Sequence, residues 1–107
     1  MKFKTHNENR YITTGGITSL QGHIDISYKE LVKIFGESDC WDDYKTDAEW
    51  DIEFEDRTVA TIYNYKTGKN YLGEEGLSKE EIRDWHIGGR NKRAVELVHK
   101  AVEDFRE

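Results

Sequence analysis

The sequence predicts an α+β fold with two layers: an antiparallel sheet of about four strands that carries two main helices on one face. Three observations lead to this prediction. The chain has 107 residues, which is enough for a single domain. Short runs rich in β-branched and aromatic residues alternate with two segments of helical period. Short turns join several of these runs, and short turns favour antiparallel neighbours.

The composition supports one domain with one core. The chain is 36% apolar and 36% charged, and its apolar residues include 3 Trp, 6 Tyr and 4 Phe. This is enough for one thin core and argues against disorder. Residues 1–14 are polar and have no period, so we expect a mobile N-terminal segment or an edge segment there, followed by a single domain over residues 15–107.

The domain is expected to begin with a strand and a helix. Residues 17–26 predict the strand, in which Gly22 marks a bulge or a close backbone approach. Ser27 and Glu30 have the spacing of a capping box, and the apolar stripe after them ends at Gly36. Together they predict a helix of about two turns.

A hairpin is predicted in the middle of the chain. Residues 46–55 alternate strictly between apolar and polar side chains, and this period of two is typical of a half-buried strand. Its apolar side consists of Ala48, Trp50, Ile52 and Phe54. Asp56 and Arg57 then form a tight turn into residues 58–66, so we expect the two runs to pair. The alternation also places Trp50 in the core.

The last third of the domain is expected to contain a loop, a strand and a helix. Residues 67–77 hold three glycines and predict a long loop. Ser78 and Glu81 form a second capping box, which predicts one helical turn, and residues 84–89 predict a short last strand. Asn91 is expected to cap the last helix. The apolar positions of this helix are Ala94, Val95, Val98, Ala101, Val102 and Phe105.

The charge is strongly polarised along the chain. The formal net charge is −6, but residues 37–56 alone hold ten carboxylates and one lysine, a net −9. The rest of the chain is therefore nearly neutral. This balance argues against general nucleic-acid binding, although a local basic patch can still bind phosphate.

Other features bear on compartment. No apolar run approaches the roughly 18 residues of a membrane span, and the first ten residues lack the apolar stretch of a signal peptide. Cys40 is the only cysteine, which excludes an intramolecular disulfide and a cysteine-rich zinc site. We expect a soluble intracellular protein with no membrane partner.

The first candidate site is an anion-binding segment at the start of the last helix. Helix N-termini favour anions, glycines allow close approach to the backbone, and three basic residues add charge. Nearby aromatic side chains on the last strand and the hairpin are suited to stacking a base. The candidate ligand-binding residues are Tyr63, Tyr65, Lys66, Trp85, His86, Gly88, Gly89, Arg90, Asn91, Lys92 and Arg93. The alternative is that the glycines only turn the chain and the basic residues are solvated.

The second candidate site is the acidic side of the predicted hairpin strand. Carboxylates at every second position lie about 7 Å apart, near the spacing of phosphates along a nucleic-acid strand, so this face resembles DNA in its charge. Its candidate residues are Asp42, Asp43, Asp47, Glu49, Asp51, Glu53 and Glu55. The alternative is a solvent-facing strand that its charge keeps soluble and unpaired with other chains.

Metal and catalytic sites are not predicted. The four histidines are scattered without a paired spacing, so the sequence predicts no metal site and no cofactor. Cys40 lies among acids that disfavour its thiolate, and no serine lies in a nucleophile motif. A catalytic centre with His86 as base is the weaker alternative, so we expect binding rather than turnover and do not expect an enzyme.

Four segments together resemble a family of small bacteriophage proteins, most of which have no assigned function. They are ITSLQG at 17–22, DAEW at 47–50, TVATIYNYK at 58–66 and WHIGG at 85–89. The likeness spans about residues 15–102. It implies a viral protein made in the cytoplasm of an infected bacterial host, and small accessory proteins of this kind are often counter-defence factors. Family likeness names no chemistry by itself.

Two functions follow as hypotheses. In the first, the protein sequesters a phosphorylated, nucleotide-type signal of the host defence on the anion-binding segment. In the second, an inhibitor of the anti-CRISPR or DNA-mimic type blocks a host nuclease or effector with the acidic face. The first is slightly favoured, because the helix N-terminus supplies a directional mechanism. A pocket usually needs more walls than one thin sheet offers, so a nucleotide site shared between the subunits of a homo-oligomer is compatible with the first hypothesis.

Overall fold

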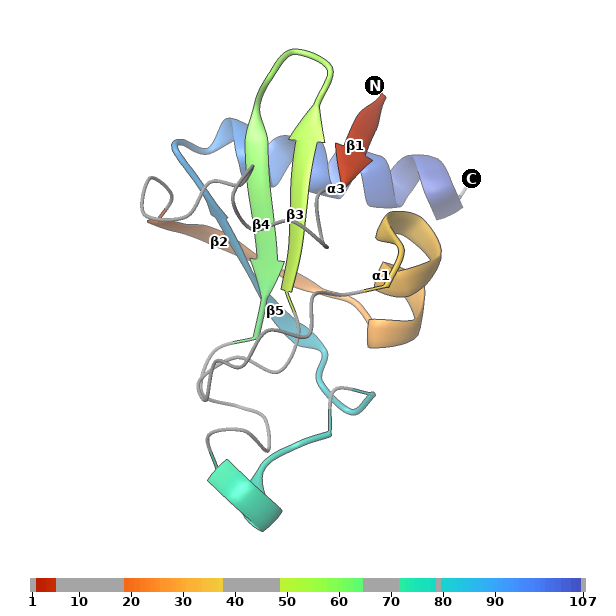
Figure 1. The fold of residues 1–107 in the computed structure, drawn as a ribbon, viewed down its shortest axis with the longest axis vertical. Helices are drawn as coiled ribbons and strands as arrows, with labels where there is room; N and C mark the ends of the chain where they lie inside the picture. The colour runs from red at the N-terminus through yellow and green to blue at the C-terminus, as the bar shows by residue number, and fades with distance from the viewer. Residues whose placement is uncertain (1, 6–18, 38–48, 65–71, 79, 107) are drawn as a thin grey trace.

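The computed structural model describes residues 2–5, 19–37, 49–64, 72–78 and 80–106. Over these residues the chain has an α+β fold, in which two helices pack against a five-stranded antiparallel sheet (Figure 1). The predicted fold class is therefore confirmed, with one strand more than expected. Neither described helix is long and apolar enough to cross a lipid bilayer.

The sheet has the strand order β1-β3-β4-β5-β2, and all four neighbouring pairs are antiparallel. Its strands are β1 (Phe3–Thr5), β2 (Ser19–Asp25), β3 (Glu49–Phe54), β4 (Val59–Tyr63) and β5 (Asp84–Gly89). The helices are α1 (Tyr28–Phe35) and α3 (Arg93–Arg106), and η2 (Gly73–Glu75) is a single 3₁₀ turn. Strands β1 and β2 form the two edges.

Strand β1 corrects the expectation of a mobile N-terminal segment. Its three residues pair with β3, and the ring of Phe3 packs against Phe35 and Phe54 with centroid distances of 5.1 and 6.0 Å. The alternative expectation, an edge segment, describes Phe3–Thr5, because one anchored aromatic ring fixes a strand too short to show a period. Residues 6–14 lie outside the described residues.

Strand β2 and helix α1 follow their sequence signals. The register of β2 against β5 shifts between Leu20 and Gly22, so the predicted bulge lies there. The hydroxyl of Ser27 accepts a hydrogen bond from the backbone N–H of Glu30 at 3.1 Å, which caps α1 as predicted. At its other end, Gly36 accepts a hydrogen bond from Nε1 of Trp50 at 2.8 Å, which ties the helix to β3.

The β3–β4 hairpin has the predicted turn. The backbone N–H of Arg57 donates to the carbonyl of Phe54 at 2.9 Å, and that of Phe54 donates to the carbonyl of Thr58 at 2.8 Å. Arg57 adopts a left-handed conformation with φ of 69°, as in a three-residue hairpin loop that ends in a bulge. The carboxylate of Asp56 accepts from the backbone N–H of Thr58 at 2.9 Å, which stabilises the turn.

The core lies between the sheet and the two helices. Trp50 is fully buried, as predicted, and its ring lies 5.3 Å from that of Trp85 in an edge-to-face arrangement. Helix α3 contributes Leu97, which the predicted stripe omitted, whereas Phe105 is 47% exposed and does not belong to the core. The buried apolar residues are Ile24, Ile26, Leu31, Phe35, Trp50, Ile52, Phe54, Ala60, Ile62, Ile82, Trp85, Ile87, Ala94, Leu97, Val98 and Val102.

The second capping box forms without the helix it predicted. The hydroxyl of Ser78 donates to the carboxylate of Glu81 at 2.8 Å, and the backbone N–H of Ser78 donates to the same oxygen at 3.1 Å. The backbone N–H of Glu81 in turn donates to the carbonyl of Ser78. These contacts close a turn, which leads into β5 through the buried side chain of Ile82.

Candidate functional site

The strands carry polar side chains on the face opposite the core, which we call the polar face. Cross-strand register places four of them in one row over β2, β5, β4 and β3, in the order His23, His86, Tyr63 and Glu49. Asp84 precedes His86 by two residues on β5, so it lies on the same face. The polar face consists of His23, Asp25, Glu49, Asp51, Glu53, Thr61, Tyr63, Asp84, His86 and Gly88.

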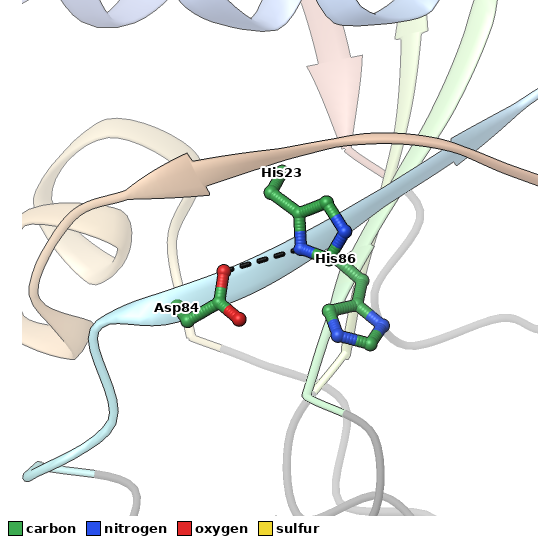
Figure 2. A group of neighbouring side chains, drawn as sticks. All are labelled: His23, Asp84 and His86. Carbon is green, nitrogen blue, oxygen red and sulfur yellow. Dashed lines mark hydrogen bonds and ion pairs between the residues drawn. The ribbon is translucent and has the colours of Figure 1, made fainter.

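Three side chains gather at the β2 edge of this face. Nδ1 of His23 lies 3.1 Å from Oδ1 of Asp84, and the rings of His23 and His86 stand edge to face with centroids 4.6 Å apart. Figure 2 shows all three side chains on the same side of β2 and β5. One nitrogen of each imidazole and one oxygen of the carboxylate all lie within 4.8 Å of one another. This arrangement of two imidazoles and a carboxylate is suited to holding a cation.

The electrostatics of the cluster favour neutral imidazole at His86. Burial and then the neighbouring His23 lower the pKa of His86 below its ordinary value, while Asp84 opposes this shift. The side chains of His23 and Asp84 are 50% and 71% exposed, so the cluster is accessible to solvent. His86 itself is half-buried. At His86 the lowered pKa therefore favours the neutral imidazole, whose free nitrogen can bind a cation.

Tyr63 extends the cluster towards the middle of the sheet. Its ring centroid lies 5.4 Å from that of His86, again edge to face. Next to them, Gly88 has no side chain, and a Cβ at that position would lie 3.4 Å from Cε1 of Tyr63 and 2.5 Å from the hydroxyl of Thr61. The ring of Tyr63 therefore covers Gly88. Among the described residues of the predicted anion site, Tyr63, His86 and Gly88 therefore lie next to one another.

The basic residues of the predicted anion site are dispersed. Arg93 forms an ion pair with Asp56 at 2.8 Å, and Nζ of Lys92 donates to the carbonyl of Gln21. Arg90 is exposed directly after β5. The side chain of Asn91 accepts from the backbone N–H of Arg93 at 3.0 Å, which fulfils its expected capping role and occupies one amide donor of the helix start.

Two further residues of the predicted anion site, Trp85 and Gly89, have structural roles. Trp85 is fully buried on the core side of β5, opposite His86, so its expected role in stacking a base is corrected. Gly89 lies under α3, where a Cβ would approach that of Ala94 to 2.5 Å, so it serves helix packing. The reason is the alternation along β5, which assigns successive residues to opposite faces. Tyr65 and Lys66 lie outside the described residues.

The predicted acidic face is less exposed than expected. Asp51 is only 1% exposed, Glu49 and Glu53 are half-buried, and Glu55 is exposed. Glu53 also lies directly opposite Lys4 of β1, which brings a positive charge to this side of β3. The expected solvent-facing row is therefore corrected for Glu49, Asp51 and Glu53, whereas Glu55 is exposed as expected. The remaining members, Asp42, Asp43 and Asp47, lie outside the described residues.

Neither His23 nor Asp84 was predicted as a site residue, and no metal site was expected from the sequence. The spacing that unites the cluster is not local, because 61 residues separate His23 from Asp84. The available signal was the match between two short polar patterns, His23-x-Asp25 and Asp84-x-His86, on two predicted strands. It becomes informative only when β2 and β5 are known to be neighbours.

Comparisons of the chain with protein-family models, with curated proteins and with solved structures found no match. The resemblance to small bacteriophage proteins therefore stays a prediction.

Proposed function

We propose that this protein binds a phosphorylated, nucleotide-type ligand stoichiometrically on its polar face and alters no covalent bond. The observation that carries the proposal is the pair of Tyr63 and His86, whose rings lie 5.4 Å apart on neighbouring strands. Aromatic and imidazole rings on a sheet surface offer stacking contacts to a base, each worth about 1–3 kcal/mol. Gly88 lies beneath the ring of Tyr63 and so belongs to the support of this pair.

The phosphate contact is assigned to Arg90. It follows β5 directly, and its side chain is exposed. Guanidinium groups bind phosphate in a bidentate manner. Lys92 and Arg93, which belonged to the predicted site, contact Gln21 and Asp56 instead, so they contribute less to this proposal.

The biological setting follows from the resemblance to bacteriophage proteins. A small viral protein that holds a nucleotide signal lowers the free concentration of that signal in the host cytoplasm. Binding in excess of the signal is enough to silence a host immunity component, and no catalytic group is required. We therefore propose a counter-defence protein that acts as a sponge.

Isothermal calorimetry with a panel of cyclic and linear nucleotides tests the proposal. We expect one member of the panel to bind saturably, and Tyr63→Ala, His86→Ala and Arg90→Ala each to weaken binding about tenfold or more, which corresponds to roughly 1.4 kcal/mol. Lys100→Ala is the charge control, because Lys100 lies exposed on α3. Absence of heat and of a thermal shift across the whole panel would contradict the proposal.

The alternative function, inhibition of a host nuclease by the acidic face, has a matched experiment of its own. The variant Glu53→Gln/Glu55→Gln removes two charges from the described part of that face. If inhibition of a host effector is observed and this variant abolishes it, the acidic face is the binding surface. Under our proposal the variant binds its nucleotide as the wild type does.

A further inference from the structure

The cluster of His23, Asp84 and His86 brings together three side chains of the types that bind metal ions, which nucleotide binding does not require. Two strands that are distant in sequence present three metal-binding side chains on one face. His23 and His86 are register partners across the β2–β5 pair, and Asp84 is on the same side two residues earlier on β5. Such placement on paired strands fixes the Cα positions of all three residues, as a pre-organised site requires.

The distances fit one ion with small side-chain adjustments. In tetrahedral coordination at 2.0–2.1 Å, donor atoms lie roughly 3.3 Å apart. The separation of 3.1 Å between Nδ1 of His23 and Oδ1 of Asp84 is already at this value. All three donor atoms lie within 4.8 Å of one another, so no pair has to close by more than about 1.5 Å to reach this spacing (Figure 2).

We propose that His23, Asp84 and His86 bind a divalent transition-metal ion, Zn²⁺ in the cell, through one nitrogen of each imidazole and one oxygen of Asp84. Two nitrogen donors and one carboxylate match the preferences of Zn²⁺, and Mg²⁺ or Ca²⁺ would demand more oxygen ligands. A three-residue set leaves the fourth position open to water or to a ligand. The exposure of His23 and Asp84 gives the ion access from solvent.

The surroundings of the cluster are compatible with a cation. Arg83, the neighbouring basic residue, donates to Asp25 at 2.9 Å, so its charge is directed to another carboxylate. The metal proposal does not rest on the nucleotide proposal, because each is measured with its own probe.

Titration of the untagged chain with Co²⁺, followed by displacement with Zn²⁺, tests the proposal. We expect one Co²⁺ per chain, visible as d–d absorption bands, and full displacement by Zn²⁺. His23→Ala and His86→Ala should each raise the Kd at least about tenfold, the scale on which even outer-shell changes act. His99→Gln is the matched control: it removes an exposed imidazole on α3 but keeps a donor for the carbonyl of His23, and it should leave the Kd within about twofold.

A measurement on the wild type keeps the test independent of variant folding. Added Zn²⁺ should shift the imidazole resonances of His23 and His86 in nuclear magnetic resonance spectra and leave those of His99 in place. Two results would overturn the proposal: no saturable binding at one ion per chain, or an equal loss of affinity in His99→Gln and the two alanine variants. Shifts confined to other histidines would overturn it as well.

Discussion

Arg57 is the one non-glycine residue with a positive φ among residues 2–5, 19–37, 49–64, 72–78 and 80–106. Its left-handed conformation closes the β3–β4 turn at a position where glycine is ordinarily preferred. For a residue with a Cβ this conformation costs about 1–2 kcal/mol. A glycine would avoid that cost, but its greater entropy in the unfolded chain would offset about 0.5–1 kcal/mol of the stabilisation. The left-handed conformation of Arg57 could not be predicted from the sequence, because arginine has no preference for positive φ.

We therefore expect Arg57→Gly to stabilise the protein by about 0.5–1 kcal/mol, as measured by urea unfolding. Arg57→Ala is the matched control, since it removes the same side chain but retains the Cβ and its strain. That variant should be neutral or slightly destabilised. Equal stability of the two variants would show that the side chain, rather than the backbone conformation, determines the effect.

The packing of strand β5 against β4 requires a residue without a side chain at position 88. Gly88 is the register partner of Thr61 on β4, and a Cβ there would lie 2.5 Å from the threonine hydroxyl. Thr61 is itself only 6% exposed and cannot move aside freely. Overpacking of this kind typically costs about 1–3 kcal/mol.

A double-mutant cycle tests this contact. We expect Gly88→Ala to destabilise the protein by about 1–3 kcal/mol and Thr61→Ala to relieve part of that loss, with a coupling of about 1 kcal/mol or more. Unfolding in urea measures all four proteins of the cycle. Strictly additive effects would mean that Gly88 is required for a reason other than its contact with Thr61.

Most elements were predictable from the sequence, because their signals are local. The cap at Ser27, the turn at Asp56 and the alternation around Trp50 each depend on neighbours within a few residues, and each is present in the structure. Strand β1 was harder to predict, because Phe3 packs on two rings that are distant in sequence. The turn at Ser78 shows the converse: local capping contacts form, yet no helix follows.

At the scale of the whole molecule, the candidate site was harder to predict than the fold. Tyr63 and His86 were predicted as ligand contacts, but His23 and Asp84 were not. The strand order determines which residues lie next to His86, and the sequence does not show that order. Trp85 illustrates the same limit. A period of two shows that it and His86 occupy opposite faces, but only the packing of α1 and α3 determines which face is the core.

The two layers are joined by contacts between distant segments, and one of these links the hairpin turn to α3. The carboxylate of Asp56 accepts from the backbone of Thr58 at 2.9 Å and from Nε of Arg93 at 2.8 Å. The hydroxyl and the backbone N–H of Thr58, and then the guanidinium of Arg93, lower the pKa of Asp56 to about 2 from an ordinary value of 3.8.

This shift predicts how the stability of the whole protein depends on pH. Since the folded-state pKa lies below the unfolded value, ionised Asp56 stabilises the fold above about pH 4, and its contribution is lost as the pH falls towards 2. We expect Asp56→Asn to be less stable than the wild type at pH 6 and the difference to shrink towards zero near pH 2, as measured by urea unfolding across this range. Asp104→Asn, which removes an exposed carboxylate from α3, is the control and should have only a small effect at pH 6. A constant difference between Asp56→Asn and the wild type from pH 6 to pH 2 would show that the carboxylate acts through its shape and not through its charge.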